Sequence, residues 1–430
     1  MTMNLINGER VPTEELSLHL SDLPKRVIKT LEKPLLTAEI VIHACEKLAQ
    51  QIPDAMIYEK LTDLGVPNPQ IEEGILEFRK IMREGYLQKR VEIELGKNFG
   101  MIRQKEAVEE QILPLGVLFH IAAGNMEGLP IYSVIEGLLS GNINFLKLPS
   151  VDGGLTVDLL QKLCAIEPRL AEYIYVFAFG KEEKASIQTL IQLSDAIVLW
   201  GGDETVSAIR KITPPNTKII EWGHKLSFAY VTKEGATDSA LKGVAQNIAL
   251  TNQLLCSSCQ GIFLDTEEFE EAQGFCKKFF PILETVAKEY PPIPLGPRAQ
   301  NSLIFRTRKL EKFQGIPSYI YRGKNANLLL ETDQALSLSM RFRNPWVKCL
   351  PRKSLIETLR PYKNHLQSAA LLCGEKEQED LRNQLWRAGV VRLTSGENLM
   401  ESYCGEPHDG QYPLRAYTRI VSASTAYKAK

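Results

Sequence analysis

The sequence lacks a net charge and a long apolar run, and each absence argues against a class of function. Its 51 basic residues nearly cancel its 52 acidic ones, so no excess positive field exists to attract a nucleic-acid backbone. The most apolar stretch, Ile112–Ala123, is interrupted by Pro114, Gly116 and His120 and is shorter than the ~20 residues that a membrane helix needs. We therefore expect neither nucleic-acid binding nor a membrane span.

Signals for export and for metal binding are also missing. Met1–Pro12 is polar and contains no apolar core of signal-peptide length, so we expect a cytoplasmic protein whose cysteines are reduced. Of its eight cysteines only Cys256 and Cys259 lie close together, which fits a redox pair, half of a zinc site, or a nucleophile with a bystander. The zinc interpretation is weak, because the sequence has no second cysteine pair and no His-x-x-x-His run.

The apolar pattern changes along the chain and predicts an α/β protein. Leu16–Ile112 carries Leu and Ile at three- and four-residue spacing, which predicts several amphipathic helices. After Pro114, short apolar runs alternate with helical stretches, which is typical of buried parallel strands with crossover helices in a doubly wound sheet. These runs are residues 116–121, 144–148, 174–178 and 196–200. A second region of this kind starts at about Leu226, with strand-like runs at 227–231 and 261–264.

Ligands of doubly wound sheets bind beyond the carboxyl ends of the strands, so the residues that follow each run are candidate site residues. They are small or turn-forming, and comprise residues 122–125, 149–150, 180–181 and 201–203. We interpret Gly201-Gly202-Asp203 as a turn that opens a helix, with Asp203 as its N-cap. Its N–H groups would face a phosphate or the nicotinamide end of a cofactor, although taken on its own the motif is better explained as a simple strand-to-helix turn. No Gly-x-Gly-x-x-Gly fingerprint follows these strands, so an ordinary Rossmann dehydrogenase is not supported.

Several segments resemble motifs of the aldehyde dehydrogenase superfamily, in the same order. Glu221-Trp222-Gly223-His224-Lys225 resembles its Glu-Leu-Gly-Gly-Lys motif, and Cys256 follows 35 residues after Glu221. Upstream, Asn125 occupies the place of the oxyanion-hole asparagine. Residues 144–150 resemble the Lys-Pro-Ser cofactor segment, except that Leu148 separates the lysine from the proline.

Within that superfamily the sequence most resembles the LuxC-type acyl-CoA reductases, the fatty-acid reductases that supply aldehyde for bacterial luminescence. The resemblance runs from about residue 95 to residue 425. It is carried by residues 114–117, 124–130, 137–142, 256–258 and 408–414. It implies reduction of an acyl thioester to an aldehyde by NADPH, and an acyl-protein synthetase as a partner.

The resemblance also implies roles for single residues. Cys256 would attack the thioester carbonyl, and the side chain of Asn125 with the backbone N–H of Cys256 would stabilise the oxyanion. Glu221 would be the general base of aldehyde oxidation, but in a reductase its role stays open between thiol activation, protonation of the hemithioacetal and no role. His120 and His224 are alternative proton carriers, although a lone histidine near a strand is more often a core residue.

The cofactor site would be built at the strand ends. Lys147 would bind the adenine ribose, and the neutral Ser150 leaves room for a ribose 2′-phosphate, so NADPH is expected, with NADH as the alternative. The remaining candidate cofactor residues are Gly180, Gly201, Gly202 and Asp203.

We therefore predict an aldehyde dehydrogenase-like α/β fold with two doubly wound parallel-sheet domains and a helical N-terminal segment. The predicted parts are a helical segment (1–95), a cofactor domain (96–225), a thiol domain (226–400) and a C-terminal segment (401–430) that returns to the cofactor domain or an oligomer interface. The expected substrate is acyl-CoA or an acyl-protein thioester, and the expected assembly is a homo-oligomer. The alternatives are an NAD(P)-dependent aldehyde dehydrogenase and an acyl-carrying subunit of an acyl-protein synthetase complex.

Overall fold

The apolar runs of the sequence form the parallel strands of two sheets in the computed structural model. The structure describes residues 3–66, 68–105, 108–122, 129–149, 153–313, 319–399 and 401–424. The chain divides into two compact units, the first made of Met1–Gly223 with Tyr403–Lys430 and the second of His224–Ser402. The predicted helical segment 1–95 thus belongs to the same unit as the strands that follow it. The assignment of cofactor and thiol roles to the two units stays a prediction.

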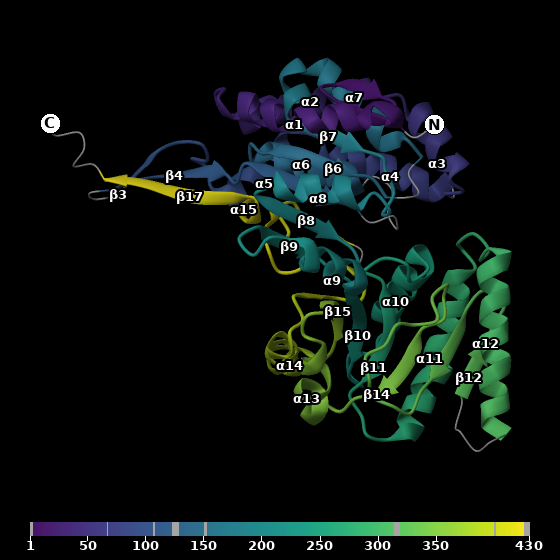
Figure 1. Ribbon diagram of the computed structural model, residues 1–430. Coiled ribbons are helices and arrows are strands. Elements are labelled where there is room, and N and C mark those ends of the chain that lie inside the picture. Colours follow the sequence, from purple (N-terminus) through teal and green to yellow (C-terminus); the bar gives the residue numbers. More distant parts are fainter. Residues whose placement is uncertain are drawn as a thin grey trace. The chain divides into compact units, whose positions relative to one another are not determined.

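The first unit is built on a seven-stranded sheet whose central strands are buried along their whole length (Figure 1). The order is β2 (Glu9–Val11), β1 (Asn4–Ile6), β7 (Ile174–Phe177), β6 (Ile143–Lys147), β5 (Val117–Ile121), β8 (Ala196–Trp200) and β9 (Lys218–Trp222). Strands β5 to β9 are parallel, and β1 is antiparallel to β7. The direction of winding reverses between β5 and β8, which is where a doubly wound sheet opens a crevice at its carboxyl ends.

The helices of the first unit include the predicted N-terminal ones. They are α1 (Leu16–Leu31), α2 (Ala38–Gln51), α3 (Asp54–Asp63), α4 (Asn68–Ile81), α5 (Glu84–Leu95), α6 (Leu129–Leu139), α7 (Leu155–Ile166), α8 (Lys184–Gln192), α9 (Asp203–Ile212) and α15 (Pro413–Ala416). Short 3-10 helices are η1 (Thr13–Glu15) and η2 (Pro168–Glu172). Helix α2 packs against α6 and α7, which connect the central strands, so the N-terminal helices cover the sheet of this unit.

The helical prediction up to Ile112 is wrong beyond Leu95. Helix α5 ends at Gly96, whose φ of 91° is unfavourable for other residues. The following residues form β3 (Arg103–Lys105) and β4 (Val108–Pro114), which join β17 (Thr418–Ser424) in a three-stranded antiparallel sheet that projects from the first unit (Figure 1). Because β4 pairs along its whole length with a strand about 300 residues away, its local pattern does not reveal its conformation.

The C-terminal segment is anchored to the first unit through Tyr417 and Leu414. The carbonyl oxygen of Tyr417 accepts hydrogen bonds from Leu115 N at 3.1 Å and from Asn142 Nδ2 at 3.0 Å. The N–H of Leu414 donates to Glu94 Oε2 at 2.8 Å. The buried carboxylate of Glu94 is paired in turn with Arg90. These contacts join residues after Tyr403 to α5 and to the loops around β5.

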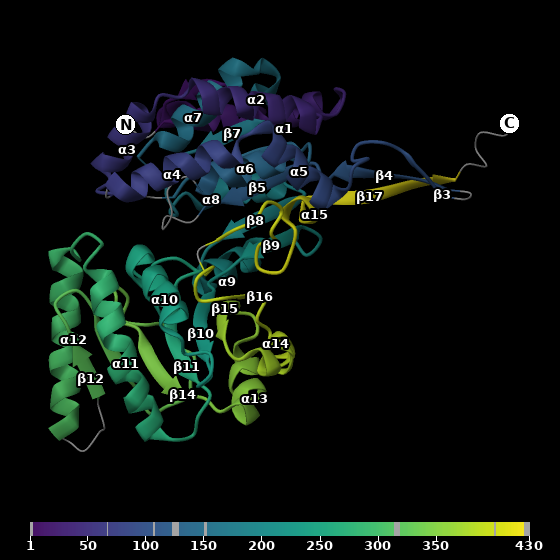
Figure 2. The same ribbon diagram turned by 180° about the vertical axis from the view of Figure 1, so that it is seen from behind.

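The second unit contains the other doubly wound sheet (Figure 2). Its order is β12 (Tyr319–Arg322), β13 (Asn327–Leu330), β14 (Trp346–Cys349), β11 (Cys259–Leu264), β10 (Leu226–Val231), β15 (Leu366–Leu372) and β16 (Arg392–Thr394). All are parallel except β12. Its helices are α10 (Asp238–Thr251), α11 (Phe269–Ala287), α12 (Leu295–Phe313), α13 (Leu355–Leu359) and α14 (Glu375–Ala388), with η3 (Arg352–Ser354) and η4 (Arg360–Tyr362). The predicted pair of doubly wound parallel sheets is confirmed. In the described part of the chain, no helix has the length and apolar character required to cross a membrane.

His120 lies at the centre of the first sheet and is a satisfied core residue. Its Nδ1 lies 2.7 Å from Ser133 Oγ and its Nε2 lies 3.0 Å from Asn144 Oδ1. The amide oxygen only accepts, so Nε2 carries the proton and Nδ1 accepts from the Ser133 hydroxyl. Burial lowers the pKa of His120 from 6.5 to about 4. The ring is therefore neutral and enclosed, which does not suit the proton-carrier role considered for it.

We predict that this buried ring makes the first unit less stable in mild acid. The unfolded chain takes up a proton below the ordinary pKa of 6.5, whereas the folded ring resists it down to about 4. The contribution of this ring to the free energy of unfolding is thus complete above pH 6.5. It is lost as the pH falls, by about 2 kcal/mol between about pH 7 and pH 5. Thermal melting should show a smaller loss over this interval in His120→Gln than in the wild type. His43→Gln, at an exposed position of α2, is the control. Equal pH dependence in wild type and His120→Gln would contradict the prediction.

Candidate active site

Cys256 is exposed on a loop that precedes the strand β11 of the second unit. We call residues 252–258, between α10 and β11, the thiol loop. The carbonyl oxygen of Cys256 accepts a hydrogen bond of 2.7 Å from Ser227 Oγ in β10, and Ser227 Oγ accepts in turn from Ser368 N at 3.2 Å. Since β10, β11 and β15 are parallel and begin near these residues, the thiol loop lies at the amino-terminal edge of the second sheet.

The start of the thiol loop has a strained backbone that buried side chains stabilise. Asn252 and Gln253 have φ angles of 48° and 60°, a region that costs about 1–3 kcal/mol for a non-glycine residue and is frequent at functional sites. The buried amide of Gln253 donates to the carbonyl oxygens of Cys259 at 3.0 Å and Gln260 at 3.2 Å. Asn247 Oδ1 accepts from Cys259 N at 2.7 Å. The roles of Ser227, Asn247 and Gln253 are not predicted from the sequence. No local pattern indicates that these side chains hydrogen-bond to the loop and to the start of β11.

The two neighbouring cysteines have opposite environments. Cys259 is fully buried, its thiol donates to the Gly261 carbonyl at 3.3 Å, and burial raises its pKa to about 12. It therefore stays protonated and unreactive. All eight cysteines lie in the described part of the chain and none forms a disulfide there. Nor do the described residues include a cluster of His, Cys, Asp and Glu that would hold a metal ion.

Lys147, at the carboxyl end of β6, is a buried cation that has more hydrogen-bond donors than it has acceptors among the described residues. Its Nζ donates to the carbonyl oxygen of Leu148 at 3.2 Å and lies 6.0 Å from the ring centre of Phe179. Burial lowers the pKa of Lys147, and the nearby carboxylate of Glu182 partly offsets this effect. Within the described ranges it has no other hydrogen-bond partner, although an ammonium group carries three donors. Among the described residues, this ammonium group thus has donors that could bind a hydroxyl group.

The glycines at the strand ends lie where the sequence predicts, but the Asp203 cap is wrong. Gly180 follows β7, and Gly201 and Gly202 follow β8, with Gly201 N donating to the Trp222 carbonyl at 3.4 Å. Gly202 is the N-cap of α9, so that Asp203 is the first helical residue and makes no side-chain cap. Asp203 and Glu204 put two carboxylates in the first turn. They interact favourably with the helix dipole and would repel a phosphate, which favours a nicotinamide over a phosphate at this turn.

Two candidate residues lie outside the described residues, and a third is engaged in an ion pair. Asn125 and Ser150 fall in segments 123–128 and 150–152, which are not among the described residues. Glu221, in β9, accepts from Arg210 Nε of α9 at 2.6 Å, where the guanidinium is largely exposed. Glu221 is thus placed two residues before the boundary of the first unit, with one carboxylate oxygen occupied.

The structure adds an aromatic cluster at the carboxyl ends of β8 and β9. The ring of His408 lies 5.1 Å from that of Trp200 and 5.0 Å from that of Trp222, and the two indoles are 5.7 Å apart. Trp200 directly precedes Gly201. The His-Asp-Gly motif that the sequence singles out near the C-terminus therefore packs beside the candidate cofactor turn, which sequence spacing does not reveal.

The chain is similar to known proteins in sequence and in fold. The chain matches the family described as Acyl-CoA reductase (LuxC) over residues 36–420. It is 25% identical over 352 residues to the long-chain acyl-protein thioester reductase of Photorhabdus laumondii, covering 79% of this chain and 70% of that protein. It is 22% identical over 324 residues to the protein of that name from Vibrio harveyi, covering 73% and 65%, and 25% identical over 320 residues to that from Aliivibrio fischeri, covering 72% and 64%. The aligned chain thus spans less than two thirds of the length of these last two relatives.

Solved structures of aldehyde dehydrogenases share the fold. Betaine aldehyde dehydrogenase from Staphylococcus aureus, in complex with NAD+, superimposes with a TM-score of 0.73 at 14% identity, covering 99% of this chain and 97% of that one. For glyceraldehyde-3-phosphate dehydrogenase from Methanocaldococcus jannaschii, complexed with NADP, the TM-score is 0.71 at 13% identity, with 98% of each chain covered. The predicted aldehyde dehydrogenase-like fold is confirmed. With this fold and a family match that spans most of its length, the chain belongs to the LuxC family of acyl-CoA reductases.

Proposed function

We propose that this protein reduces a long-chain acyl thioester to an aldehyde, with Cys256 as the covalent nucleophile and a nicotinamide nucleotide as the hydride donor. The observation that carries the proposal is the exposed thiol of Cys256 on a loop whose neighbouring side chains are buried and hydrogen-bonded. The family match and the names of the relatives support the same reaction class. Since those relatives are longer, their substrate and partners are part of the proposal.

In the proposed reaction, the Cys256 thiolate attacks the carbonyl carbon of the thioester. A carbon–sulfur bond to Cys256 forms, the bond to the carrier sulfur breaks, and the carrier leaves as a thiol after taking a proton. When bound, a reduced nicotinamide nucleotide supplies a hydride to the carbonyl carbon. The bond between that carbon and the Cys256 sulfur then breaks, which releases the aldehyde and regenerates the thiolate. The backbone N–H of Cys256 and the amide of Asn125 are the proposed donors to the carbonyl oxygen.

The nucleotide is proposed to bind at the carboxyl edge of the first sheet. Lys147 would donate to the adenine ribose, and the Gly201–Gly202 turn would approach the nicotinamide end. Gly180, where a side chain would collide with the carboxylate of Glu182, would line the site beside β7. NADPH is the proposed cofactor, with Ser150 as the neutral residue near its 2′-phosphate. One observation favours the alternative, NADH, because Glu182 lies close enough to Lys147 to affect its pKa and a carboxylate there would repel a 2′-phosphate.

The carrier of the acyl group is proposed to be CoA or a protein. The relatives are named for acyl-protein thioesters, and an acyl-protein synthetase is the partner that we propose to supply such a substrate. Both carriers present the same thioester bond to Cys256. A cytoplasmic location and homo-oligomeric assembly stay predictions from the sequence.

Oxidation of an aldehyde to an acid is the second candidate reaction, because Glu221 stands where the superfamily has its general base. To activate water, this carboxylate would have to break its contact with Arg210 or use its other oxygen. We expect aldehyde from acyl-CoA with NADPH, and little acid from aldehyde with NADP+. Chromatographic analysis of the two reactions distinguishes them, and acid as the main product would favour the dehydrogenase.

We predict that Cys256→Ala abolishes covalent labelling by radioactive long-chain acyl-CoA, because it removes the proposed nucleophile. Cys259→Ala is the matched control, since its thiol is buried and protonated, and it should label like the wild type. Mass spectrometry of the labelled peptide identifies the acylated sulfur. Persistent labelling of Cys256→Ala would exclude this nucleophile.

We also predict a distinct role for each charge at the candidate ribose site. Lys147→Met should raise the KM for the nucleotide by about 10-fold, the effect of a lost hydrogen bond from a charged donor, and leave covalent acylation of Cys256 unchanged. Glu182→Gln should shift the preference toward NADPH, because it removes a repulsive carboxylate. Initial rates with both nucleotides measure these effects. An unchanged KM in Lys147→Met would place the nucleotide elsewhere.

A further inference from the structure

Arg343 of the second unit is a buried cation whose hydrogen-bond partners are all uncharged. Its side chain is 2% exposed. Nε donates to the Ala249 carbonyl at 3.3 Å and to Asn252 Oδ1 at 3.0 Å. Nη1 donates to the Ala287 carbonyl at 3.1 Å and Nη2 to the Pro291 carbonyl at 2.9 Å. Among the residues for which the structure gives positions, no carboxylate forms an ion pair with it. The dipoles of these carbonyl groups stabilise the positive charge of the guanidinium. The ring of Tyr290, whose centre lies 5.9 Å from Arg343 Cζ, contributes as well.

The guanidinium connects the ends of two helices. Ala249 lies in the last turn of α10, and Ala287 is the last residue of α11. Carbonyl groups in the last turn of a helix have no partner within it, and the negative end of the helix dipole lies there. Arg343 supplies donors and positive charge to both ends. It thereby fixes the position where α10 ends and the thiol loop begins.

The segment that contains Arg343 also contacts the thiol loop through its backbone. We call residues 339–344 the clamp segment, which leads into β14. Arg341, Phe342 and Arg343 have φ angles of 57°, 49° and 64°, and Phe342 N donates to the carbonyl oxygen of Asn252 at 2.8 Å. Two left-handed stretches of backbone are therefore hydrogen-bonded to each other at Asn252, four residues before Cys256. Such strain persists only where surrounding contacts determine the conformation.

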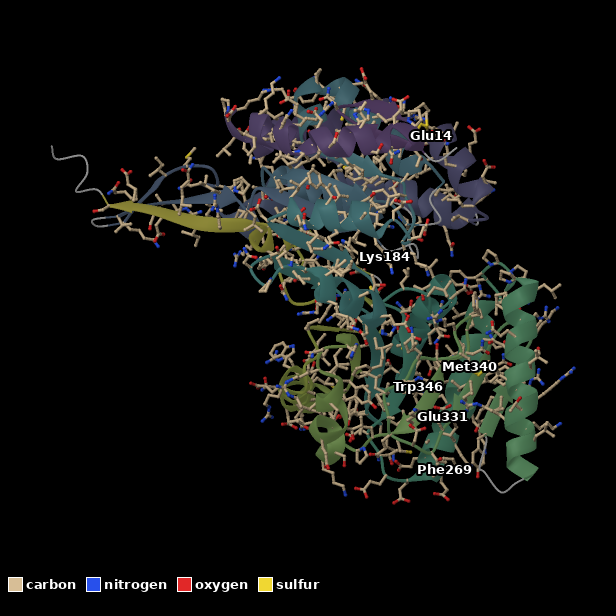
Figure 3. The ribbon with its side chains drawn as sticks, in the orientation of Figure 1. Glu14, Lys184, Phe269, Glu331, Met340 and Trp346 are labelled. Carbon is tan, nitrogen blue, oxygen red and sulfur yellow. The ribbon has the colours of Figure 1, made fainter. Side chains whose placement is uncertain are left out.

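Further hydrogen bonds join the clamp segment to the residues on either side of Cys256. Asn344 N donates to Gln253 Oε1 at 2.9 Å, and Ser339 Oγ donates to Gln260 Oε1 at 2.8 Å. Figure 3 labels Met340 within this segment and Trp346 at the start of β14. The start of the thiol loop and the beginning of β11, just beyond the end of the loop, are thus attached to one short segment, about 85 residues later in the chain.

We propose that Arg343 is a positioning residue for the Cys256 thiol, holding the thiol loop in its strained conformation by joining it to the ends of α10 and α11. The inference rests on the proposed role of Cys256 as the nucleophile. A purely stabilising role for Arg343 would affect the whole second unit. A positioning role affects the reaction of the thiol and leaves nucleotide binding, proposed for the first unit, unchanged.

The test compares Arg343→Gln and Arg343→Lys with Lys348→Met. Lys348 is an equally buried cation of the second unit, but its Nζ is paired with Asp333 at 2.7 Å and Glu331 at 3.2 Å. The polar partners of its Nζ in the described part of the chain all lie in residues 331–337, outside the thiol loop, so its removal controls for the loss of a buried charge. Figure 3 labels Glu331, which marks the place of this pair in the second unit.

Arg343→Gln should lower kcat for reduction of acyl-CoA on the order of 10- to 100-fold, the effect of misplacing a reacting group by about 1 Å. The KM for the nucleotide should not change. Hydrogen exchange of residues 252–258 should become faster in this variant. Arg343→Lys, which keeps the charge but only part of the donor geometry, should be intermediate. Lys348→Met should lower the melting temperature and leave both kcat and the exchange of the thiol loop near wild-type values.

Wild-type kcat and loop exchange in folded Arg343→Gln would overturn the inference. So would equal kinetic losses in Arg343→Gln and Lys348→Met, because these would show a general effect of destabilisation. If Arg343→Gln does not fold, Arg343→Lys decides by the same criteria. Failure of the proposed function has a different result, since wild-type Cys256 would then remain unacylated by acyl-CoA whatever the Arg343 variants show. Faster hydrogen exchange of the thiol loop in those variants would still show that the clamp segment holds the loop in place.

Discussion

The thiol loop exposes the sulfur atom of Cys256, whereas the sulfur atom of Cys259, three residues later at the start of β11, is buried. Cys256 and Cys259 have the same chemistry, and only the backbone between them separates an accessible thiol from one whose pKa burial raises to about 12. The hydrogen bond from Ser227 to the Cys256 carbonyl holds the loop against β10, and Asn247 fixes the first N–H of β11. A loop without these contacts would be free to draw Cys256 into the apolar surroundings of β11, where a thiol is inert.

The two units place their candidate functional groups at opposite ends of their strands. In the first unit, Lys147 and the Gly201–Gly202 turn follow β6 and β8, as the rule for doubly wound sheets predicts. In the second unit, Cys256 precedes β11 and so lies where the strands begin. The carboxyl edge of that sheet is occupied instead by an ionic network in which Arg352 contacts Asp265 and Glu377. The rule about strand ends thus locates the candidate nucleotide site, whereas the chemistry of a reactive cysteine is what locates the thiol.

Much of the fold can be predicted from the sequence, because buried parallel strands leave continuous apolar runs. The strands β5 to β8 of the first unit, and the strands β10 and β11 of the second unit, follow such runs closely. The strand β4 cannot be predicted from its local sequence, because its partner β17 is about 300 residues away. The Asp203 cap fails for a local reason, because Gly202 takes the cap position and moves the carboxylate into the helix.

The residues of the candidate site can likewise be divided into those that the sequence indicates and those that it does not. Residue chemistry and the family resemblance are enough to propose Cys256, Lys147 and Glu221 as candidates, because their side chains are recognisable by type, and their roles stay predictions. They do not suffice for Gln253 or Arg343, whose importance comes from left-handed backbone and from contacts across about 90 residues. Such residues look like ordinary polar positions in one sequence.

The ion pair between Glu221 and Arg210 bears on the direction of the proposed reaction. An exposed pair of this kind contributes only about 0–1 kcal/mol, so it does not immobilise the carboxylate. Its effect is on chemistry rather than on stability, because a carboxylate oxygen that accepts from a guanidinium is not available to take a proton from water. In an aldehyde-forming enzyme this is an advantage, since water attacking the acyl group on Cys256 would produce acid and waste the thioester. The proposed reductase is compatible with this occupied oxygen, whereas the alternative dehydrogenase would have to use the other oxygen of Glu221 or break the contact with Arg210.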